Sequence, residues 1–284
     1  MRSNKKSLGM RAQSLLILWL SRVVIWFAII IVVFPMIWIV ASSFSKGDSF
    51  FFGSTFPTEW GVDNYQRLFN ETNFVRWVAN SIKVCTSVSI IQIVLTVTAA
   101  YAFSRMRFHG RKYGIMALMI LQIFPASMAT AAIYMMIYKL ELVDNLIALI
   151  LLLAGGSAYN IWLMKNYIDK LPRELDEAAL VDGAGHFTIF RKIIIPLSRP
   201  MIVVIFLFSF IGAYSEFIIT AVVMRSPENL PLSVGLQTFI NGNFATRWTQ
   251  FSAAALLSSI PIMIIFMLLQ KYIQSGLAAG AVKG

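Results

Sequence analysis

The stretch EAALVDG at residues 177–183, followed after nine further residues by IIIP at residues 193–196, decides how the rest of the chain is interpreted. Eleven charged side chains fall between residues 165 and 200. On both sides of this segment lie apolar runs long enough to cross a bilayer. The sequence therefore predicts a folded polar loop between two membrane spans, placed in water and against a partner.

The first half of this loop has the features of a helix start. Pro172 suits the first turn of a helix, where its missing N–H is not needed. Glu174 and Glu177 then favour the positive end of the helix dipole. We expect a short helix that begins near Pro172.

Small residues indicate how this helix ends and what it contacts. Leu175, Ala178 and Ala179 recur at helical spacing and form a face that allows close approach to a partner. Gly183 and Gly185 tolerate the left-handed backbone that ends a helix. We therefore expect a glycine turn after the first helix.

A second short helix follows in the pattern. Phe187, Phe190 and Ile194 recur on one face. Pro196 and Pro200 then interrupt the helix before the next membrane span. The sequence predicts two short helices joined at glycine.

Composition assigns the chain to the integral membrane proteins, because 58% of its residues are hydrophobic and only 13% are charged. The net charge of +11 reflects short basic loops and does not indicate nucleic acid binding. One cysteine and two histidines offer neither a disulfide framework nor a metal site. Common catalytic and phosphate-binding motifs are absent, so we expect no catalytic residue and no cofactor, and any ATP to be hydrolysed by another chain.

Apolar runs of about 20 residues predict an all-α protein with six membrane helices. They are expected at residues 23–41, 84–103, 114–138, 146–164, 201–224 and 251–269. Residues 1–22 form an N-terminal segment, residues 23–270 the membrane domain and residues 271–284 a tail. The first run is longer than a secretory signal usually has, so we expect it to be retained.

Lys and Arg predict the orientation. With the N-terminus in the cytoplasm, 17 of the 24 basic residues fall on the cytoplasmic side and 7 outside. We therefore expect a multi-pass protein of the cell membrane, with both termini and the 165–200 loop in the cytoplasm.

Polar residues inside the spans are candidates for a solute path. Glu216 is the acid expected within the run 201–224, and an ionised acid facing lipid is costly, so it should face a partner helix or a watery path. Tyr214 and Asn160 are weaker candidates, together with Tyr159 and Gln122. A structural role for Glu216 remains an equal alternative.

The segment 225–250 is longer than a helix hairpin requires. It contains Asn241, Gly242 and Asn243, which we expect to contact a soluble partner outside the membrane.

The spacing of Glu-Ala-Ala, Gly and Ile-x-apolar-Pro resembles the coupling loop of binding-protein-dependent ABC importer permeases, with Ile195 where Leu is usual. The segments at 232–239, 251–255 and 276–284 are similar to those of MalG-type subunits of maltose and maltodextrin importers. By this resemblance, six residues of the loop contact an ATPase: Glu177, Ala178, Ala179, Gly183, Ile193 and Pro196.

The resemblance also implies the partners and the cycle. The implied partners are a dissimilar second permease subunit, an ATPase dimer, an extracytoplasmic sugar-binding protein and the membrane lipid. ATP would close the ATPase dimer and drive alternating access for an oligosaccharide, with maltodextrin favoured. An ion-coupled secondary sugar carrier is the alternative, and a membrane-embedded enzyme is a weaker one because paired acids or a metal set are missing from the spans.

Overall fold

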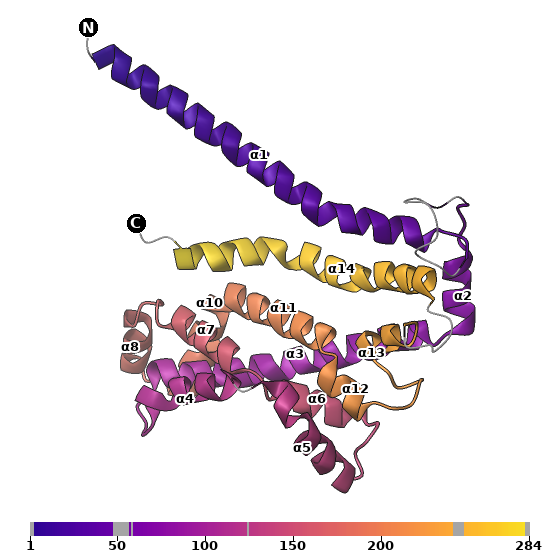
Figure 1. Ribbon diagram of the computed structural model, residues 1–284. Helices are drawn as coiled ribbons and strands as arrows, with labels where there is room; N and C mark the ends of the chain where they lie inside the picture. Colours follow the sequence, from indigo (N-terminus) through magenta and orange to yellow (C-terminus); the bar gives the residue numbers. More distant parts are fainter. Residues whose placement is uncertain (1–2, 48–56, 58, 124, 241–246, 282–284) are drawn as a thin grey trace. The chain divides into compact units, whose positions relative to one another are not determined.

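The computed structural model describes residues 3–47, 57, 59–123, 125–240 and 247–281, and Figure 1 shows that these residues are mainly helical. Their one isolated bridge joins Ser45 and Trp60. The all-α class expected from the sequence is confirmed. The helices are α1 (Ser3–Ser43), α2 (Asp63–Glu71), α3 (Phe74–Arg105), α4 (Arg111–Ile123), α5 (Ala126–Lys139), α6 (Leu146–Ala154), α7 (Ala158–Ile168), α8 (Glu174–Val181), α9 (His186–Ile189), the π-helix η1 (Phe190–Ile194), α10 (Ile195–Leu197), α11 (Arg199–Ser215), α12 (Ile218–Val223), α13 (Leu232–Gln237) and α14 (Trp248–Ala281).

The chain divides into two compact units, one of residues 1–70 and 242–256 and the other of residues 71–241 and 257–284. In the first unit, Asn64 of α2 joins three segments. Its side-chain amide donates to the carbonyls of Ser43 at 3.0 Å and Ser45 at 2.8 Å, and its oxygen accepts from the hydroxyl of Thr249 at 3.2 Å. A buried side chain thus satisfies the backbone carbonyls where α1 ends.

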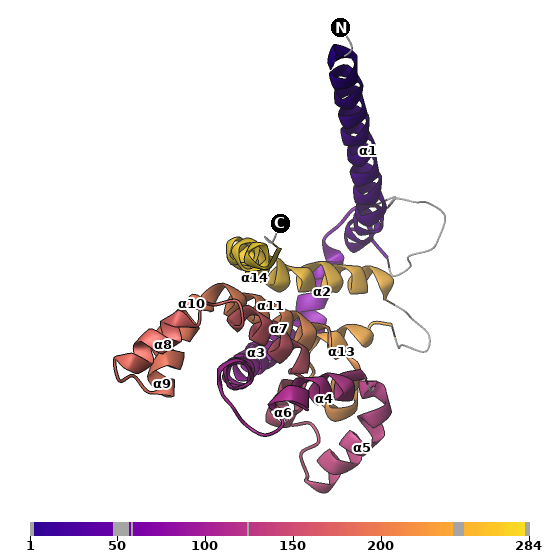
Figure 2. The same ribbon diagram turned by 90° about the vertical axis from the view of Figure 1, so that its left-hand side faces the viewer.

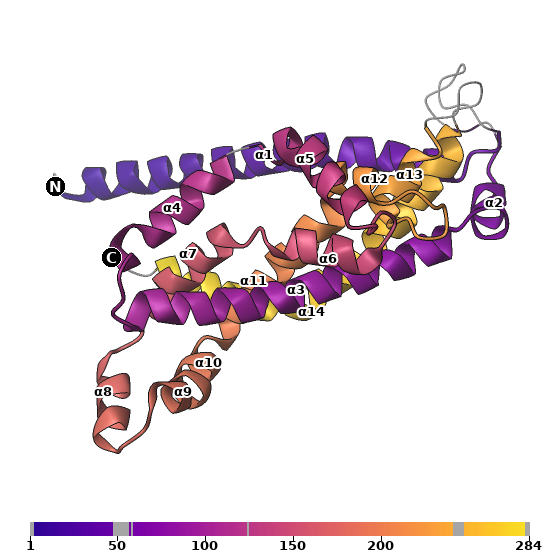
Figure 3. The ribbon, with the colours of Figure 1, turned by 90° about the horizontal axis from the view of Figure 1, so that it is seen from below.

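The second unit is built around α3, which packs against α6, α7, α11 and α13. Figure 3 shows these helices along the length of α3, with α13 near its N-terminal end and α8 to α10 near its C-terminal end. The buried residues of α3 include many small or polar ones, among them Ser81, Ser89, Thr96 and Ala100. Small residues allow the close helix packing that membrane proteins rely on.

Within the part of the chain that the structure describes, three helical stretches are each long and apolar enough to cross a membrane: Ile17–Ser43, Phe74–Arg105 and Trp248–Tyr272. Three more candidates are bent pairs of helices. Leu146–Ala154 and Ala158–Ile168 meet at 48°, and His186–Leu197 and Arg199–Ser215 meet at 76°. Arg111–Ile123 and Met128–Lys139 form the third pair. Among the described residues, up to six spans result if each pair crosses once, which agrees in number with the expectation, although the pair at 186–215 includes residues 186–197 of the predicted loop.

The sequence near the start of α3 has an architectural role. The Trp77 indole is buried and donates to the carbonyl of Pro227 at 2.7 Å. One turn later, the Asn80 amide donates to the carbonyl of Glu228 at 3.0 Å, and the Ser81 hydroxyl accepts from the backbone N–H of Leu232 at 2.7 Å. These three side chains fasten the segment before α13 to α3.

The turn between α5 and α6 contacts the end of α12 through Asp144. Its carboxylate accepts from the backbone N–H groups of Arg225 at 2.9 Å and Ser226 at 3.0 Å, and from the Asn229 amide at 2.8 Å. Burial by itself would raise the pKa of Asp144, but these hydrogen bonds together lower it below its usual 3.8. The carboxylate therefore remains charged at neutral pH and holds the two segments together.

The C-terminal tail is helical over its described residues, 271–281. Helix α14 continues through it to Ala281. Ala and Leu are strong helix formers, and the tail continues an existing helix, so no new nucleation is needed.

Gly235 tests how tightly α13 packs on α3. A Cβ at this position would overlap Cδ2 of Trp77, whose ring is fixed by its hydrogen bond to the carbonyl of Pro227. We expect Gly235→Ala to destabilise the protein by about 1–3 kcal/mol, the usual cost of overpacking. Thermal unfolding of the purified protein in detergent measures this. The matched control is Gly212→Ala, where a Cβ meets nothing within 4 Å, and equal melting temperatures for the two variants would contradict the packing argument.

Candidate functional site

The 165–200 loop is folded and extends from one end of the second unit, as Figure 2 shows for α8, α9 and α10. Helix α8 begins at Glu174, two residues after Pro172, and has three acids in its first turn. The chain then turns at Gly183, whose φ is +82°, and continues into α9. The two short helices and the left-handed glycine expected from the sequence are confirmed.

Gly185 differs from the expectation. Its backbone is extended, with φ −76° and ψ 163°, because it precedes α9 as the N-cap residue. One left-handed residue is enough for the turn, since the N–H of Ala184 already donates to the carbonyl of Ala179 at 2.9 Å.

The loop has an inner side that packs on its own unit. Ile189 and Ile194 are 1% exposed and form one cluster with residues of α3, α7 and α11, among them Tyr101 and Met164. Ala179 packs against the same cluster. The predicted face of Leu175, Ala178 and Ala179 is therefore divided: Ala179 faces this protein, whereas the other two are exposed.

The loop also leaves apolar side chains uncovered. Val181 is 88% exposed and Phe187 is 72% exposed, and Leu180 is exposed as well. The helical face expected from Phe187, Phe190 and Ile194 is divided, since Phe190 packs inward and Phe187 points away from the cluster. Exposed apolar residues on a folded loop are typical of a surface that binds another protein.

The residues expected to contact an ATPase lie along this loop. Glu177 and Ala178 are exposed on α8, and Gly183 is exposed at the turn. Ile193 and Pro196 are half-buried. The π-helix η1 lies just before Pro196, and the backbone N–H of Ile195 donates to the carbonyl of Phe190. A wider turn is a common way to accommodate a proline ring within a helix.

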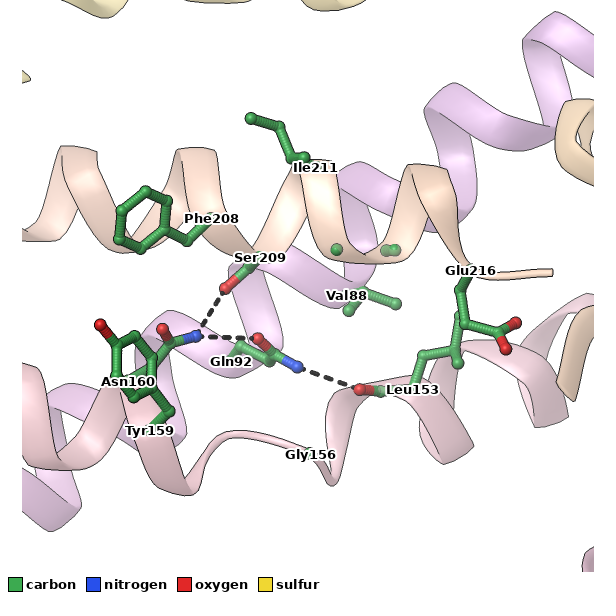
Figure 4. Close-up of a pocket in the computed structure, with 12 residues that line it drawn as sticks. Val88, Gln92, Leu153, Gly156, Tyr159, Asn160, Phe208, Ser209, Ile211 and Glu216 are labelled. Carbon is green, nitrogen blue, oxygen red and sulfur yellow. Dashed lines mark hydrogen bonds between the residues drawn. The ribbon is translucent and has the colours of Figure 1, made fainter. Parts of the chain in front are cut away.

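A cavity of about 440 Å³ lies between α3, α6, α7 and α11, and Figure 4 shows its lining. At one end, the buried Asn160 amide donates to Gln92 Oε1 at 3.3 Å and to Ser209 Oγ at 3.2 Å. Exposed aromatic rings of Tyr159 and Phe208 line the same space. Amides beside aromatic rings can bind a polar solute that has apolar faces.

Gln92 and Gln122 both contact the break between α6 and α7. Gln92 Nε2 donates to the carbonyl of Leu153 at 3.0 Å. The Gln122 amide donates to the carbonyl of Gly156 at 3.3 Å and accepts from the N–H of Tyr159 at 3.1 Å. The two glutamines replace backbone hydrogen bonds that the break removes.

Glu216 has a different environment from the continuous helix expected over residues 201–224. Helix α11 ends at Ser215, and Glu216 has an extended backbone with φ −70° and ψ 123°. Its carboxylate accepts from the N–H groups of Ile219 at 2.8 Å and Thr220 at 2.9 Å, and from the Thr220 hydroxyl at 2.6 Å. Glu216 therefore caps α12 while also lining the cavity, at the other end from Asn160 in Figure 4.

The remaining candidates are placed differently. Tyr214 does not line the cavity, and its hydroxyl donates to the carbonyl of Ser258 in α14 at 2.7 Å. Asn241, Gly242 and Asn243, expected to contact a soluble partner, lie outside the described residues.

Sequence reasoning missed Gln92 and Ser209. Both lie inside apolar runs, where a single amide or hydroxyl between hydrophobic residues is a usable signal for a buried polar contact.

Comparisons with known proteins agree with this arrangement. The profile of the family described as "Binding-protein-dependent transport system inner membrane component" matches residues 72–279. The maltodextrin transport system permease protein MdxG of Bacillus subtilis is 38% identical over 251 residues, which cover 88% of this chain and 90% of that protein. The galactooligosaccharides transport system permease protein GanQ of the same organism is 38% identical over 254 residues, with coverage of 88% and 90%.

Two further relatives extend the comparison. The maltose/maltodextrin transport system permease protein MalG of Vibrio vulnificus is 34% identical over 287 residues, covering 94% of this chain and 96% of that protein. A chain from the crystal structure of a bacterial ABC transporter involved in the import of the acidic polysaccharide alginate has a TM-score of 0.77 at 26% identity, covering 89% of this chain and 95% of that chain. The chain therefore belongs to the family of inner membrane components of binding-protein-dependent transport systems.

Proposed function

We propose that this chain is the permease subunit of an ATP-driven importer that passes an oligosaccharide, maltodextrin in the first instance, from an extracytoplasmic binding protein into the cell. The observation that carries the proposal is the projecting 165–200 loop. The inner side of the loop packs against helices of the second unit, and Val181 and Phe187 on the loop remain exposed for a partner. The identity of 38% to a maltodextrin permease over 88% of the chain supports the solute class.

The partners follow from the same proposal. An ATPase dimer binds the loop through Glu177, Ala178 and Gly183, and a dissimilar second permease subunit completes the path. The excess of Lys and Arg on one side supports a cytoplasmic position for the loop and for both termini. A sugar-binding protein docks outside, where residues 241–243 remain the proposed contact.

The cavity is the proposed contribution of this subunit to the solute path. Asn160 offers an amide, and the rings of Tyr159 and Phe208 offer flat apolar surfaces of the kind that sugars stack on. Glu216 lines the other end of the cavity. We assign Tyr214 a structural role beside the cavity and no contact with solute, because its hydroxyl donates to the carbonyl of Ser258.

An ion-coupled carrier is less well supported. Such a carrier would need an acid that is free to bind and release an ion during the cycle. The Glu216 carboxylate is held by three hydrogen bonds at the start of α12. Releasing it would leave two backbone N–H groups without partners, which makes it a poor site for repeated ion exchange.

Transport into proteoliposomes tests the function directly. The chain, reconstituted with its ATPase, partner permease and binding protein, should take up labelled maltodextrin only when ATP and the binding protein are both present. Uptake driven by a proton or sodium gradient, without ATP, would establish the carrier instead. Labelled galactooligosaccharide in parallel assays tests the solute class.

Gly183 should be sensitive to substitution because its φ is +82°. A β-branched residue there costs about 1 kcal/mol or more of backbone strain. Its side chain, which meets nothing within 4 Å in this chain, would also project towards the ATPase. We expect Gly183→Val to insert and pair normally but to lose solute-stimulated ATP hydrolysis, whereas Gly183→Ala should retain part of it.

Gly185→Val is the matched control for this prediction. It adds the same side chain two residues away, also into open space, but on an extended backbone that any residue can adopt. Hydrolysis stimulated by loaded binding protein is measured for both variants. Full stimulation in Gly183→Val would remove this glycine from the coupling mechanism, and equal losses in both variants would exclude backbone strain as the cause.

Substitutions of Glu216 separate capping from solute binding. Glu216→Gln keeps an acceptor for the N–H groups of α12, whereas Glu216→Leu leaves them unsatisfied, so we expect transport to fall about tenfold in the Leu variant and much less in the Gln variant. The melting temperature should fall together with transport in Glu216→Leu if capping is the cause. Unchanged transport in both variants would remove Glu216 from the path, and an unchanged melting temperature in Glu216→Leu would contradict the capping argument.

A further inference from the structure

One face of the C-terminal end of α3 holds the 165–200 loop at several points. Arg105 is the last residue of α3, and its Nε lies 2.6 Å from Oδ2 of Asp176 in the first turn of α8. Its Nη2 also donates to the carbonyl of Leu171 at 2.9 Å. The side chains of Arg105 and Asp176 are 6% and 13% exposed, so this ion pair is shielded from water.

Two neighbouring residues on the same face of α3 extend the contact. Ser104 Oγ donates to Asp169 Oδ1 at 2.6 Å, ahead of α8. Tyr101 Oη donates to the carbonyl of His186 at 3.3 Å, at the start of α9. Residues 101, 104 and 105 follow the i, i+3, i+4 spacing of a single helix face. Helix α3 therefore contacts the loop before α8, in α8 and after the glycine turn.

The ion pair between Arg105 and Asp176 is suited to fixing an orientation. Arg105 lies at the C-terminal end of α3 and Asp176 at the N-terminal end of α8, so each charge also faces the favourable end of its own helix dipole. Removing one partner leaves the other charge buried without compensation. An apolar pair of similar volume can restore the stability of the protein at such a site, but it does not fix the orientation of α8 relative to α3 as the ion pair does.

We propose that Arg105 is a positioning residue that fixes α8 to α3, so that a displacement of the 165–200 loop moves α3 as one body. The proposal rests on the function proposed above. Helix α3 packs against α6, α7, α11 and α13 and carries Gln92 at the cavity. When the loop moves, α3 moves with it as a rigid helix, and Gln92 at the cavity is displaced as well.

Two variants test this first in the complete reconstituted complex. Arg105→Met should lower solute uptake per ATP hydrolysed by about tenfold, because the loop loses its fixed orientation. Arg105→Met combined with Asp176→Leu should recover thermal stability and co-purification of the ATPase, whereas uptake per ATP should stay at least about fivefold below wild type.

Lys165→Met is the matched control. Lys165 also lies 2.6 Å from a carboxylate, but its partner Asp169 is four residues away on the same segment, and both side chains are about one-third exposed. This variant loses a cation and an ion pair but leaves the Arg105–Asp176 pair in place, and Asp169 still accepts from the Ser104 hydroxyl. Its uptake per ATP should stay within about twofold of wild type, as expected for an exposed pair.

The outcomes distinguish the two proposals. Wild-type uptake per ATP in Arg105→Met overturns the positioning role, and so does full recovery of coupling in the double variant, because packing alone would then suffice. If neither variant assembles, Arg105→Lys decides: it keeps the charge, so normal coupling in an assembled Arg105→Lys complex would also overturn the role of the guanidinium. Absence of ATP-dependent uptake by the wild-type complex rejects the proposed function itself.

Discussion

The constraint on which this fold depends is that a backbone N–H or carbonyl removed from water must have a partner. Continuous helices meet it automatically, but this chain interrupts several of its helices. At three helix starts or breaks a side chain supplies missing hydrogen bonds: Glu216 at the start of α12, Asn145 at the start of α6 and Gln92 at the break before α7. These hydrogen bonds hold the polar side chains in place, and two of them, Glu216 and Gln92, also line the cavity.

The same requirement explains why α3 is central. At 1.5 Å per residue, its 32 residues extend over about 48 Å. Near its N-terminal end, Trp77 donates a hydrogen bond to the segment before α13. In its middle, Gln92 donates to a backbone carbonyl at the break between α6 and α7, and at its C-terminal end Arg105 donates to the 165–200 loop. A helix that carries an uninterrupted backbone hydrogen-bond ladder is stiff, so the regions it connects are held at fixed distances along it.

The sequence predicted the parts of this fold that depend on neighbours in the chain. The short helix after Pro172 and the left-handed turn at Gly183 follow from local rules of helix starts and ends. The interruption after Ser215 could not be found in this way, because Glu216 is the only charged residue of the run 201–224 and neither glycine nor proline follows Ser215 within the run. Whether an acid in such a run caps a new helix or faces a cavity depends on the backbone around it. The division of the loop into inner and outer sides was also missed, since it depends on packing against α3 and α7.

Joining a cavity and a loop to one stiff helix has an energetic consequence for the proposed importer. A partner that binds the loop better in one orientation of α3 than in another shifts the population towards that orientation. By linkage, the factor by which the partner changes the affinity of the cavity for solute equals the factor by which solute changes the affinity of the loop for the partner. This requires that the attachment of the loop to α3 is stronger than the difference in binding between the two orientations. A pair that is about one-third exposed, such as that of Lys165 and Asp169, would separate because water competes for both charges. The shielded pair of Arg105 and Asp176 resists separation because each charge would be left without compensation, which is why the connection from loop to cavity runs through this contact.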